Sequence, residues 1–254
     1  MAGAMAIQGA YAPLPADEGG NAKPFELSPA HRAAYGCALA WCNGFINANT
    51  FLRFGLFGGF MTGNSITLGT ALVAPVDAAK AGVAAAAILA FLVGSAAGFF
   101  ADAPGRRRRG SFQVLALALV VVAACGEAAL PVIGRYAVLP LCGVMGAIDV
   151  INLKGIVKVR LAYMTGGLQK IVSAAVVCAC GRGTPEERRA AYAEARELAR
   201  FFTAFVLGAN FGAQAVKKLW TSHQYTCLPT VALAAAFIAF HERPPNGAHF
   251  TLGV

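Results

Sequence analysis

Charged residues are scarce along most of this chain. They make up 13% of its 254 residues, while hydrophobic residues make up 57%; soluble domains carry about 25% charged residues. The charges that do occur gather in the run RRRR at 106–109, in the stretch 154–200 and in the two tails. The long uncharged runs between these places are typical of an integral membrane protein.

The chain also lacks the short motifs that mark common enzymes. It contains no G-x-x-x-x-G-K-[ST], no H-E-x-x-H and no G-x-S-x-G, and its four histidines fall in tails or loops. Its seven cysteines lie almost wholly in apolar stretches without metal-type C-x-x-C pairs, which is typical of small apolar filler. We therefore expect no catalytic residue, no metal and no cofactor. The net charge of +9 is attributed to basic loops beside a membrane, and nucleic acid is not an expected partner.

Six apolar windows come close to the ~20 residues that a spanning helix needs. They cover roughly 34–52, 82–101, 112–133, 137–153, 201–219 and 222–240, and the last is the weakest because it begins polar and contains Pro229. Their alanine and leucine runs favour helices over strands. The predicted fold is all-α, a polytopic membrane helix bundle of about six spans. A disordered tail is expected at 1–32, a transmembrane domain at 33–241 and a C-terminal tail at 242–254.

Two stretches of the sequence occur twice. M-T-G-N at 61–64 returns as M-T-G-G at 164–167, and FLVGSAAG at 91–98 returns as FVLGANFG at 205–212, at offsets of 103 and 114 positions. The order is the same, and each half opens with a glycine-containing span (Gly44, Gly146). We predict a duplication, with repeat one at 33–133 and repeat two at 137–241. The G-x-x-x-G pairs in the second echo, Gly94/Gly98 and Gly208/Gly212, predict close helix packing.

Each M-T-G segment could cross a bilayer or dip in and return. If neither crosses, the lysines and arginines divide 16 to 5 between the two sides; if both cross, they divide 10 to 10, with Lys170 inside a helix. The positive-inside rule selects six spans with both termini on the cytoplasmic side. Three spans per half make the second half inverted, which gives an inverted 3+3 repeat with two interrupted or re-entrant M-T-G segments, as in many secondary transporters.

The polar residues of the M-T-G segments predict a solute site. Gly63 permits a turn, and the polar side chains around it can cap the short helix expected from Ser65 onward. Such a helix start suits an anionic or polar solute, although glycine and threonine could simply let two helices pack closely. The predicted solute contacts are Thr62, Gly63, Asn64, Ser65, Thr165 and Gly166, with Asn47 and Asp149 as polar neighbours.

Ionisable residues inside the windows are costly, at about 2.5–3.5 kcal/mol near the bilayer centre on insertion scales. Glu127 is expected to reach the interface or to pair with a residue such as Arg135. Asp149, beside Asn152, is a candidate for the site. Asn43 and Asn47 are four residues apart and share one helix face, which we expect to face the bundle interior because an unpaired buried amide is costly.

A further helix start is predicted in the charged stretch. In GTPEERRAAYAEARELARFF, Thr184 takes the N-cap position, Pro185 the first helical position and Glu187 the third, which is a capping box. We expect a cytoplasmic helix that continues into the fifth span.

The stretch GFINANTFLRFGLFGGFMTGNSITLGTAL at 44–72 resembles the YoaK-like family of multispanning membrane proteins of unknown function. The similarity is specific at M-T-G-N and at the glycine-rich entry before it, and it continues more weakly through FLVGSAAG, VMGAID and YMTGG, over roughly 35–240. Family members usually show an aspartate in place of Asn47, and a Gln-Asn pair in place of Ile148 and Asp149. The resemblance implies six or so helices and supplies no substrate.

Two functions fit these patterns. The first is a secondary transporter or channel-like carrier of a small polar or anionic solute, bound where the two M-T-G helix starts face one another. The second is a non-catalytic structural subunit or assembly factor of a larger membrane complex, which would use the G-x-x-x-G faces and basic loops for contact. Expected partners are membrane lipid, a small solute, and a homo-oligomer or larger membrane complex. The expected location is the plasma membrane or an organelle inner membrane.

Overall fold

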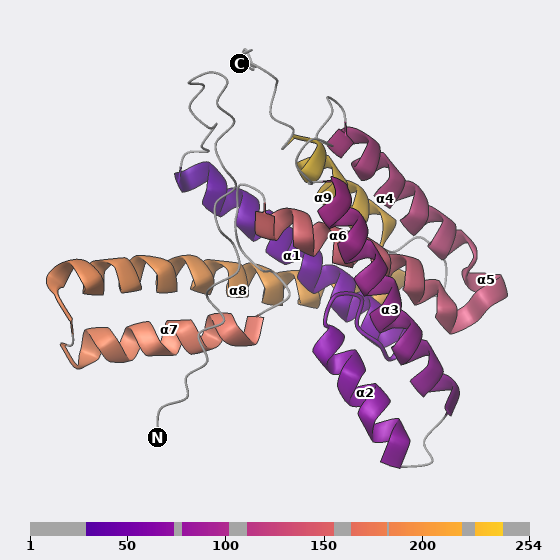
Figure 1. Ribbon diagram of the computed structural model, residues 1–254, viewed down its shortest axis with the longest axis horizontal. Helices are drawn as coiled ribbons and strands as arrows, with labels where there is room; N and C mark the ends of the chain where they lie inside the picture. The colour runs from indigo at the N-terminus through magenta and orange to yellow at the C-terminus, as the bar shows by residue number, and fades with distance from the viewer. Residues whose placement is uncertain are drawn as a thin grey trace. The chain divides into compact units, whose positions relative to one another are not determined.

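The computed structural model describes residues 29–73, 78–101, 111–154, 164–181, 183–219 and 227–240. These residues form helices joined by turns and short loops, with no strand among them, which confirms the expected all-α fold (Figure 1). Most of the two expected tails, 1–28 and 242–254, lies outside the described residues. Residues 29–32 already belong to the first helix.

A helix lies in each of the six apolar windows. These helices are α1 (Pro29–Phe54), α3 (Ala78–Ala101), α4 (Ser111–Ala128), α6 (Val138–Lys154), α8 (Pro185–Leu219) and α9 (Leu228–Phe240). Among the described residues, two segments are long and apolar enough to cross a membrane, Ala79–Ala101 and Leu130–Asn152; shorter apolar helices cover Val114–Ala128, Leu168–Ala179 and Leu228–Phe237. The number of six crossings therefore stays a prediction.

The two M-T-G strings each begin a shorter helix. These are α2 (Met61–Val73) and α7 (Met164–Ala179), of 13 and 16 residues. At 1.5 Å per residue, α2 is about 20 Å long, less than the ~30 Å hydrocarbon core of a bilayer. The expected helix start at Ser65 is wrong by one turn, because Thr62 and Gly63 already lie in the helix.

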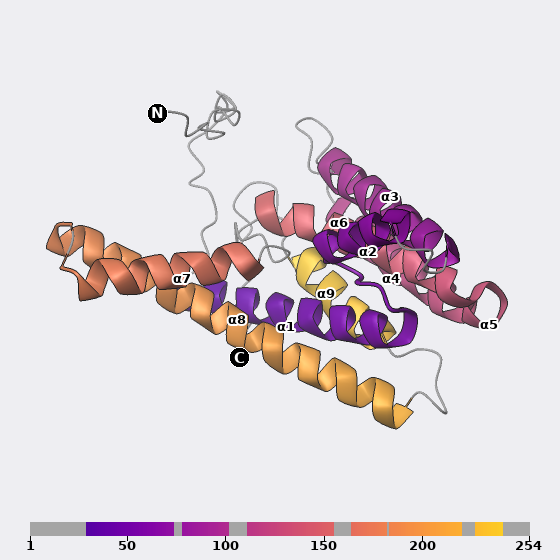
Figure 2. The same ribbon diagram turned by 90° about the horizontal axis from the view of Figure 1, so that it is seen from below.

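The helices pack in pairs that recur in the two halves. α1 packs along α8 and α3 along α6; α2 packs on α3, α7 on α8, and α4 on α9. In both views α1 lies beside α8, and α7 lies beside the first part of α8 (Figures 1 and 2). Exchanging α1 with α6, α2 with α7, α3 with α8 and α4 with α9 turns α1–α8 into α6–α3 and α2–α3 into α7–α8, and it leaves α4–α9 unchanged.

Glycines bring the α3–α6 and α1–α8 backbones into direct contact. A Cβ atom added to Gly94 would overlap the carbonyl oxygen of Gly143 in α6, and one added to Gly208 would overlap that of Trp41 in α1. Glycine is therefore required at both positions, since any other residue would push the two helices apart. The packing role predicted for these glycines is confirmed.

α8 begins with the capping box that the sequence predicts. The Thr184 hydroxyl accepts a hydrogen bond from the Glu187 backbone N–H at 3.2 Å, and the Glu187 carboxylate accepts one from the Thr184 N–H at 2.8 Å. The helix then continues without interruption to Leu219, through the fifth apolar window.

The short helix α5 (Leu130–Ile133) and the 3₁₀ helix η1 (Gly134–Ala137) link α4 to α6. Side chains from α1, α4, α6, α8 and α9 form the main core, which includes Leu39, Ile46, Leu141, Phe201 and Val231. Together, the pairings and this core place α1 and α6 in contact with one another at the centre of the described helices.

Candidate functional site

The loop after α1 folds back along that helix. Gly55 makes the turn with φ +69°, a left-handed conformation that favours glycine. Further on, the Gly58 N–H donates to the Thr50 hydroxyl at 2.8 Å and the Gly59 N–H to the Asn47 side-chain oxygen at 2.9 Å. Asn47 precedes the end of α1 by seven residues, so this glycine loop (55–60) returns roughly 10 Å along the helix. α2 therefore begins beside the middle of α1.

Asn47 holds the glycine loop in place. Its Oδ1 accepts hydrogen bonds from the N–H groups of Gly59 and Phe60, at 2.9 and 3.2 Å, and its Nδ2 donates to the carbonyl and side-chain oxygens of Asn43, at 2.9 and 2.6 Å. Asn43 and Asn47 are 4% and 2% exposed. Their predicted orientation toward the bundle interior is confirmed.

Asn64 ties the start of α2 to the same loop. Its Oδ1 accepts from the Phe57 N–H at 2.9 Å and its Nδ2 donates to the Phe57 carbonyl at 2.8 Å, with the side chain fully buried. Gly63 lies against the Phe57 ring, where a Cβ atom would collide with the aromatic carbons. This part of M-T-G-N thus packs the glycine loop onto α2.

The other predicted contacts of the M-T-G segments lie elsewhere. Thr62 and Ser65 are exposed, and the Ser65 hydroxyl donates to the Met61 carbonyl at 2.9 Å instead of capping the helix. In the second copy, Thr165 and Gly166 lie in the first turn of α7, and their side chains are outside the described part of the structure.

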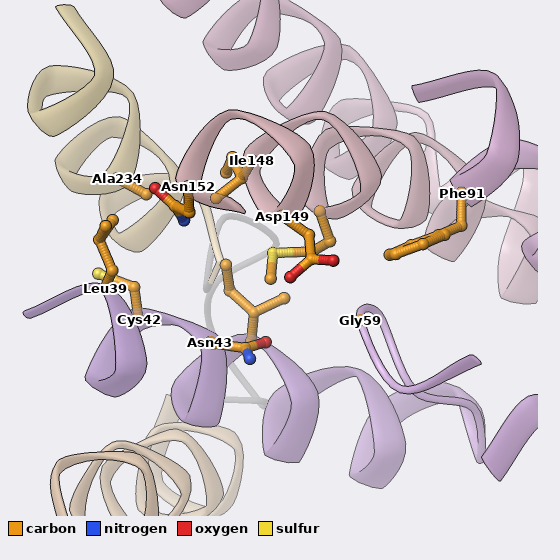
Figure 3. Close-up of a pocket in the computed structure, with 11 residues that line it drawn as sticks. Leu39, Cys42, Asn43, Gly59, Phe91, Ile148, Asp149, Asn152 and Ala234 are labelled. Atoms are coloured by element: carbon orange, nitrogen blue, oxygen red, sulfur yellow. The ribbon is translucent and has the colours of Figure 1, made fainter. Parts of the chain in front are cut away.

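A small cavity lies where α1 and α6 face each other (Figure 3). It holds about 10 Å³ of open space, close to the minimum for one water molecule. Its walls come from α1, the glycine loop, α3, α6 and α9, and its polar side chains are Asn43, Asp149 and Asn152. No residue of α2 or α7 that the structure describes lines it, so this cavity is not the one expected between the two M-T-G segments.

Asp149 occupies the place on α6 that Asn47 occupies on α1. A Cβ atom on Gly44 would overlap the backbone of residue 205 in α8, and one on Gly146 would overlap the backbone of residue 91 in α3. Residues 205 and 91 are themselves equivalent in the two G-x-x-x-G helices. The first helices therefore correspond at an offset of 102 positions, which pairs Asn47 with Asp149. Two predicted site residues thus lie at matching positions around the central crossing.

Asn152 lies one helical turn beyond Asp149 and is 2% exposed. Neither its Oδ1 nor its Nδ2 has a hydrogen-bond partner in the structure. Buried amides almost always have partners, so this residue offers both polar atoms of its amide to the cavity that it lines. The sequence signal for it was its i, i+3 spacing from Asp149 on one helix face.

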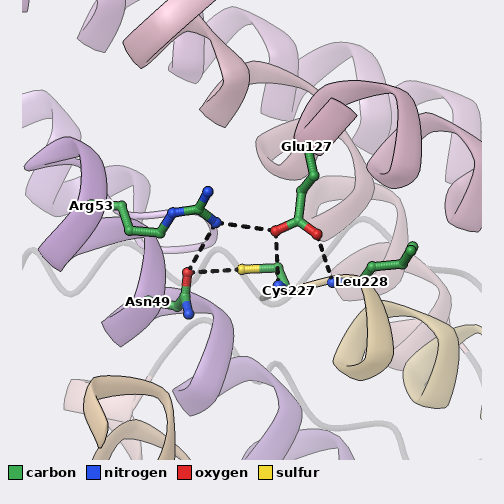
Figure 4. A network of polar contacts seen from close by, with 5 residues as sticks. All are labelled: Asn49, Arg53, Glu127, Cys227 and Leu228. Carbon is green, nitrogen blue, oxygen red and sulfur yellow. Dashed lines mark hydrogen bonds and ion pairs between the residues drawn. The ribbon is translucent and has the colours of Figure 1, made fainter. Parts of the chain in front are cut away.

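A second polar cluster joins the ends of three helices (Figure 4). The Glu127 carboxylate lies 3.1 Å from the Arg53 guanidinium, and both side chains are at most 5% exposed. It also accepts hydrogen bonds from the N–H groups of Cys227 and Leu228, at 2.8 and 3.0 Å, at the start of α9. Glu127 thus pairs with an arginine, as expected, but this arginine is Arg53 and not the exposed Arg135 suggested by the sequence.

The fold and this site define a class of protein: an all-helical protein whose polar groups meet in a central cavity between the first helices of two similar sets, α1–α4 and α6–α9. The chain belongs to the family described as Protein of unknown function (DUF1275), whose family model matches residues 35–240. YoaK-like proteins belong to this family, which confirms the resemblance noted in the sequence. No curated protein and no solved structure matches the chain.

Proposed function

We propose that this chain is a multi-pass integral membrane protein that carries a small polar solute, as a secondary transporter or channel-like carrier. The observation that carries the proposal is the central cavity, where Asn43, Asp149 and Asn152 meet between helices that turn apolar side chains outward. The half-buried Asp149 carboxylate and the buried, unpartnered Asn152 amide are costly in an apolar interior, and solute binding is a function that can offset this cost.

The outward faces of α3 and α4 support a membrane location. Leu92, Val93 and Phe100 on α3 are 57%, 62% and 61% exposed, and Val114 and Leu117 on α4 are 69% and 66% exposed. Soluble monomers rarely expose contiguous apolar surfaces of this kind. Lipid chains are the partner that suits them.

Two further observations support six spans in an inverted repeat. The Glu127 cluster brings the end of α1, the end of α4 and the start of α9 together. In an arrangement of six alternating spans, these three helix ends lie on the same side of the bilayer. The glycine loop folds back along α1, and α2 is too short to cross the hydrocarbon core. Both observations are consistent with a re-entrant segment. The 16-to-5 division of basic residues then assigns both termini to the cytoplasmic side.

The cavity narrows the kind of solute. Asp149 supplies the negative charge among the polar residues that line it, and like charges repel strongly in a poorly hydrated site. A neutral or cationic solute therefore suits this cavity better than the anion considered from the sequence. The amides of Asn43 and Asn152 would add hydrogen bonds.

Reconstituted uptake tests the proposal. Purified protein in liposomes is offered labelled urea, acetamide, glycerol, methylammonium and acetate, with protein-free liposomes as the blank. We expect uptake of at least one neutral or cationic solute, reduced about ten-fold or more in Asp149→Asn because a charged hydrogen-bond acceptor is lost. Thr70→Ala, at an exposed position of α2, is the matched control and should keep wild-type uptake. Absence of uptake by the wild type, or full uptake by Asp149→Asn, would contradict a carrier with this site.

The tight packing around the cavity supports a second function, that of a structural subunit in a larger membrane complex. Open space of about 10 Å³ and direct backbone contact in the α1–α8 and α3–α6 pairs also suit a static scaffold. A scaffold should co-purify with other chains in a defined complex after extraction in mild detergent. A carrier should purify as this chain alone, as a monomer or homo-oligomer, and retain uptake.

A further inference from the structure

Asn152 presents an unused hydrogen-bond donor and an unused acceptor inside the central cavity. The side chain is 2% exposed, and both its Nδ2 and its Oδ1 are buried without a partner. By contrast, the Asn47 amide, buried to the same degree, makes four hydrogen bonds. The difference indicates that Asn152 is reserved for a group that comes from outside the chain.

The surroundings of Asn152 restrict this group. Asp149 and Asn152 both reach from α6 toward α1, where Asn43 lies opposite (Figure 3). The Asn43 Oδ1 already accepts from Asn47. Apolar side chains such as Leu39 and Ile148 form much of the remaining wall, so the unused polar atoms that a ligand meets here are those of the Asn152 amide.

The chemistry of the two side chains then selects a class of ligand. A metal cation would satisfy the Asn152 oxygen and leave its N–H₂ group unpaired, whereas a carboxylate would satisfy the N–H₂ group and leave the oxygen unpaired. A primary amide or urea donates to Oδ1 and accepts from Nδ2 in a reciprocal pair, and its remaining N–H groups can donate to a carboxylate. We propose that the solute of this carrier is urea or a small primary amide, bound through Asn152. This inference rests on the proposed transport function.

The cavity as it stands is too small for such a molecule. Its open space of about 10 Å³ matches a single water, so entry requires the walls to move. Met145 and Phe91 are among the side chains that line the cavity, and methionine is the side chain that most readily adapts its shape. The structure thus corresponds to a closed conformation of the proposed site.

Uptake of ¹⁴C-urea and ¹⁴C-acetamide into proteoliposomes tests the inference. We expect the wild type to carry at least one of them and Asn152→Leu to carry it about ten-fold more slowly, since two hydrogen bonds to the solute are lost. Asn210→Ala replaces an exposed asparagine on α8 and should leave uptake unchanged. The unfolding temperature in detergent shows whether Asn152→Leu is folded. It should be no lower than that of the wild type, because the substitution removes an unpaired buried amide.

The outcomes separate this inference from the proposed function. Amide uptake that Asn152→Leu leaves unchanged would overturn the role of Asn152. Uptake of glycerol or methylammonium without uptake of either amide would overturn the amide class and leave the carrier function standing. Failure of the wild type to carry any of these solutes would remove both.

Discussion

Glu127, near the end of α4, satisfies polar groups from two other helix ends with one carboxylate. It pairs with Arg53 at the end of α1, and it accepts from two N–H groups at the start of α9, while its own backbone ends α4. A carboxylate at a helix N-terminus also interacts favourably with the helix dipole. Because the Arg53 side chain and Cys227 are buried, these groups cannot exchange the lost partner for water.

Removal of this carboxylate should therefore destabilise the fold. Glu127→Ala leaves the Arg53 charge buried without its carboxylate, and the expected loss is about 3–5 kcal/mol of unfolding free energy. The double variant Arg53→Met with Glu127→Leu removes both charges and should recover part of that loss, while the Cys227 and Leu228 N–H groups still lack their acceptor. Thermal or denaturant unfolding in detergent measures both effects. Equal stability of Glu127→Ala and the wild type would show that the ion pair is not formed.

For single residues, the sequence predicted the contacts that a side chain makes with its neighbours along the same helix. The shared face of Asn43 and Asn47 follows from their spacing of four residues, and the structure confirms it. The partner of Glu127 does not follow from spacing, because Arg53 is 74 residues away whereas the expected Arg135 is close in sequence. Likewise, Asn64 suited a helix cap by local rules, but a loop that packs against it uses both of its amide atoms.

Among the helices, the closest pairings depend on glycine. Gly94 and Gly208 occupy equivalent positions in α3 and α8, and each faces a carbonyl oxygen of the first helix of the opposite half, α6 or α1. The two contacts are therefore the same contact made twice. A substitution at either glycine tests whether the halves are held together in the same way.

Gly94→Ala and Gly208→Ala should each separate a helix pair. The added methyl group overlaps backbone that cannot rotate away, and overpacking of this kind costs about 1–3 kcal/mol or more. Gly82→Ala lies on α3 with open space around it and should be neutral or stabilising by up to about 1 kcal/mol, as expected from helix propensity. Unfolding temperatures of the purified variants measure the difference. If Gly94→Ala behaved like Gly82→Ala, the close approach of α3 to α6 would be contradicted.

The elements themselves were largely predictable. Apolar windows marked the places of α1, α3, α4, α6, α8 and α9, and a capping box fixed the start of α8, because both signals are local. The start of α2 was not predictable in this way. It depends on hydrogen bonds from Asn47 to the glycine loop, which exist only once the loop has folded back along α1.

Across the whole molecule, each half completes its packing with helices of the other. α1 pairs with α8 and α6 with α3, so neither half buries its first helix by itself. The sequence echoes indicated a duplication, but they could not show that the halves exchange partners. That arrangement depends on contacts between residues more than a hundred positions apart, such as Trp41 and Gly208.

Topologies with six and with eight crossings place some of the connections between helices on different sides of the membrane. The side on which Tyr136 and the cysteine pair lie can therefore tell the two topologies apart. With six spans and re-entrant α2 and α7, three spans precede Tyr136 and four precede Cys178 and Cys180, so Tyr136 and the cysteine pair lie on opposite sides. With eight spans, four crossings precede Tyr136 and six precede the cysteines, so they lie on the same side. Tyr136 is 48% exposed and the two cysteines are also exposed, which makes all three positions suitable for thiol labelling.

We expect an impermeant maleimide to distinguish the two topologies in sealed, right-side-out vesicles. A Tyr136→Cys variant with Cys125, Cys178 and Cys180 replaced by alanine should label before permeabilisation, because η1 faces outward in the six-span arrangement. A second variant carries Cys125→Ala alone and keeps Tyr136. Its Cys178 and Cys180, at the end of α7, should be labelled only after permeabilisation. The Cys125→Ala replacement is common to both because that thiol is also exposed. Labelling of both variants under the same condition would place η1 and the α7 end on one side, and the inverted repeat would then be wrong.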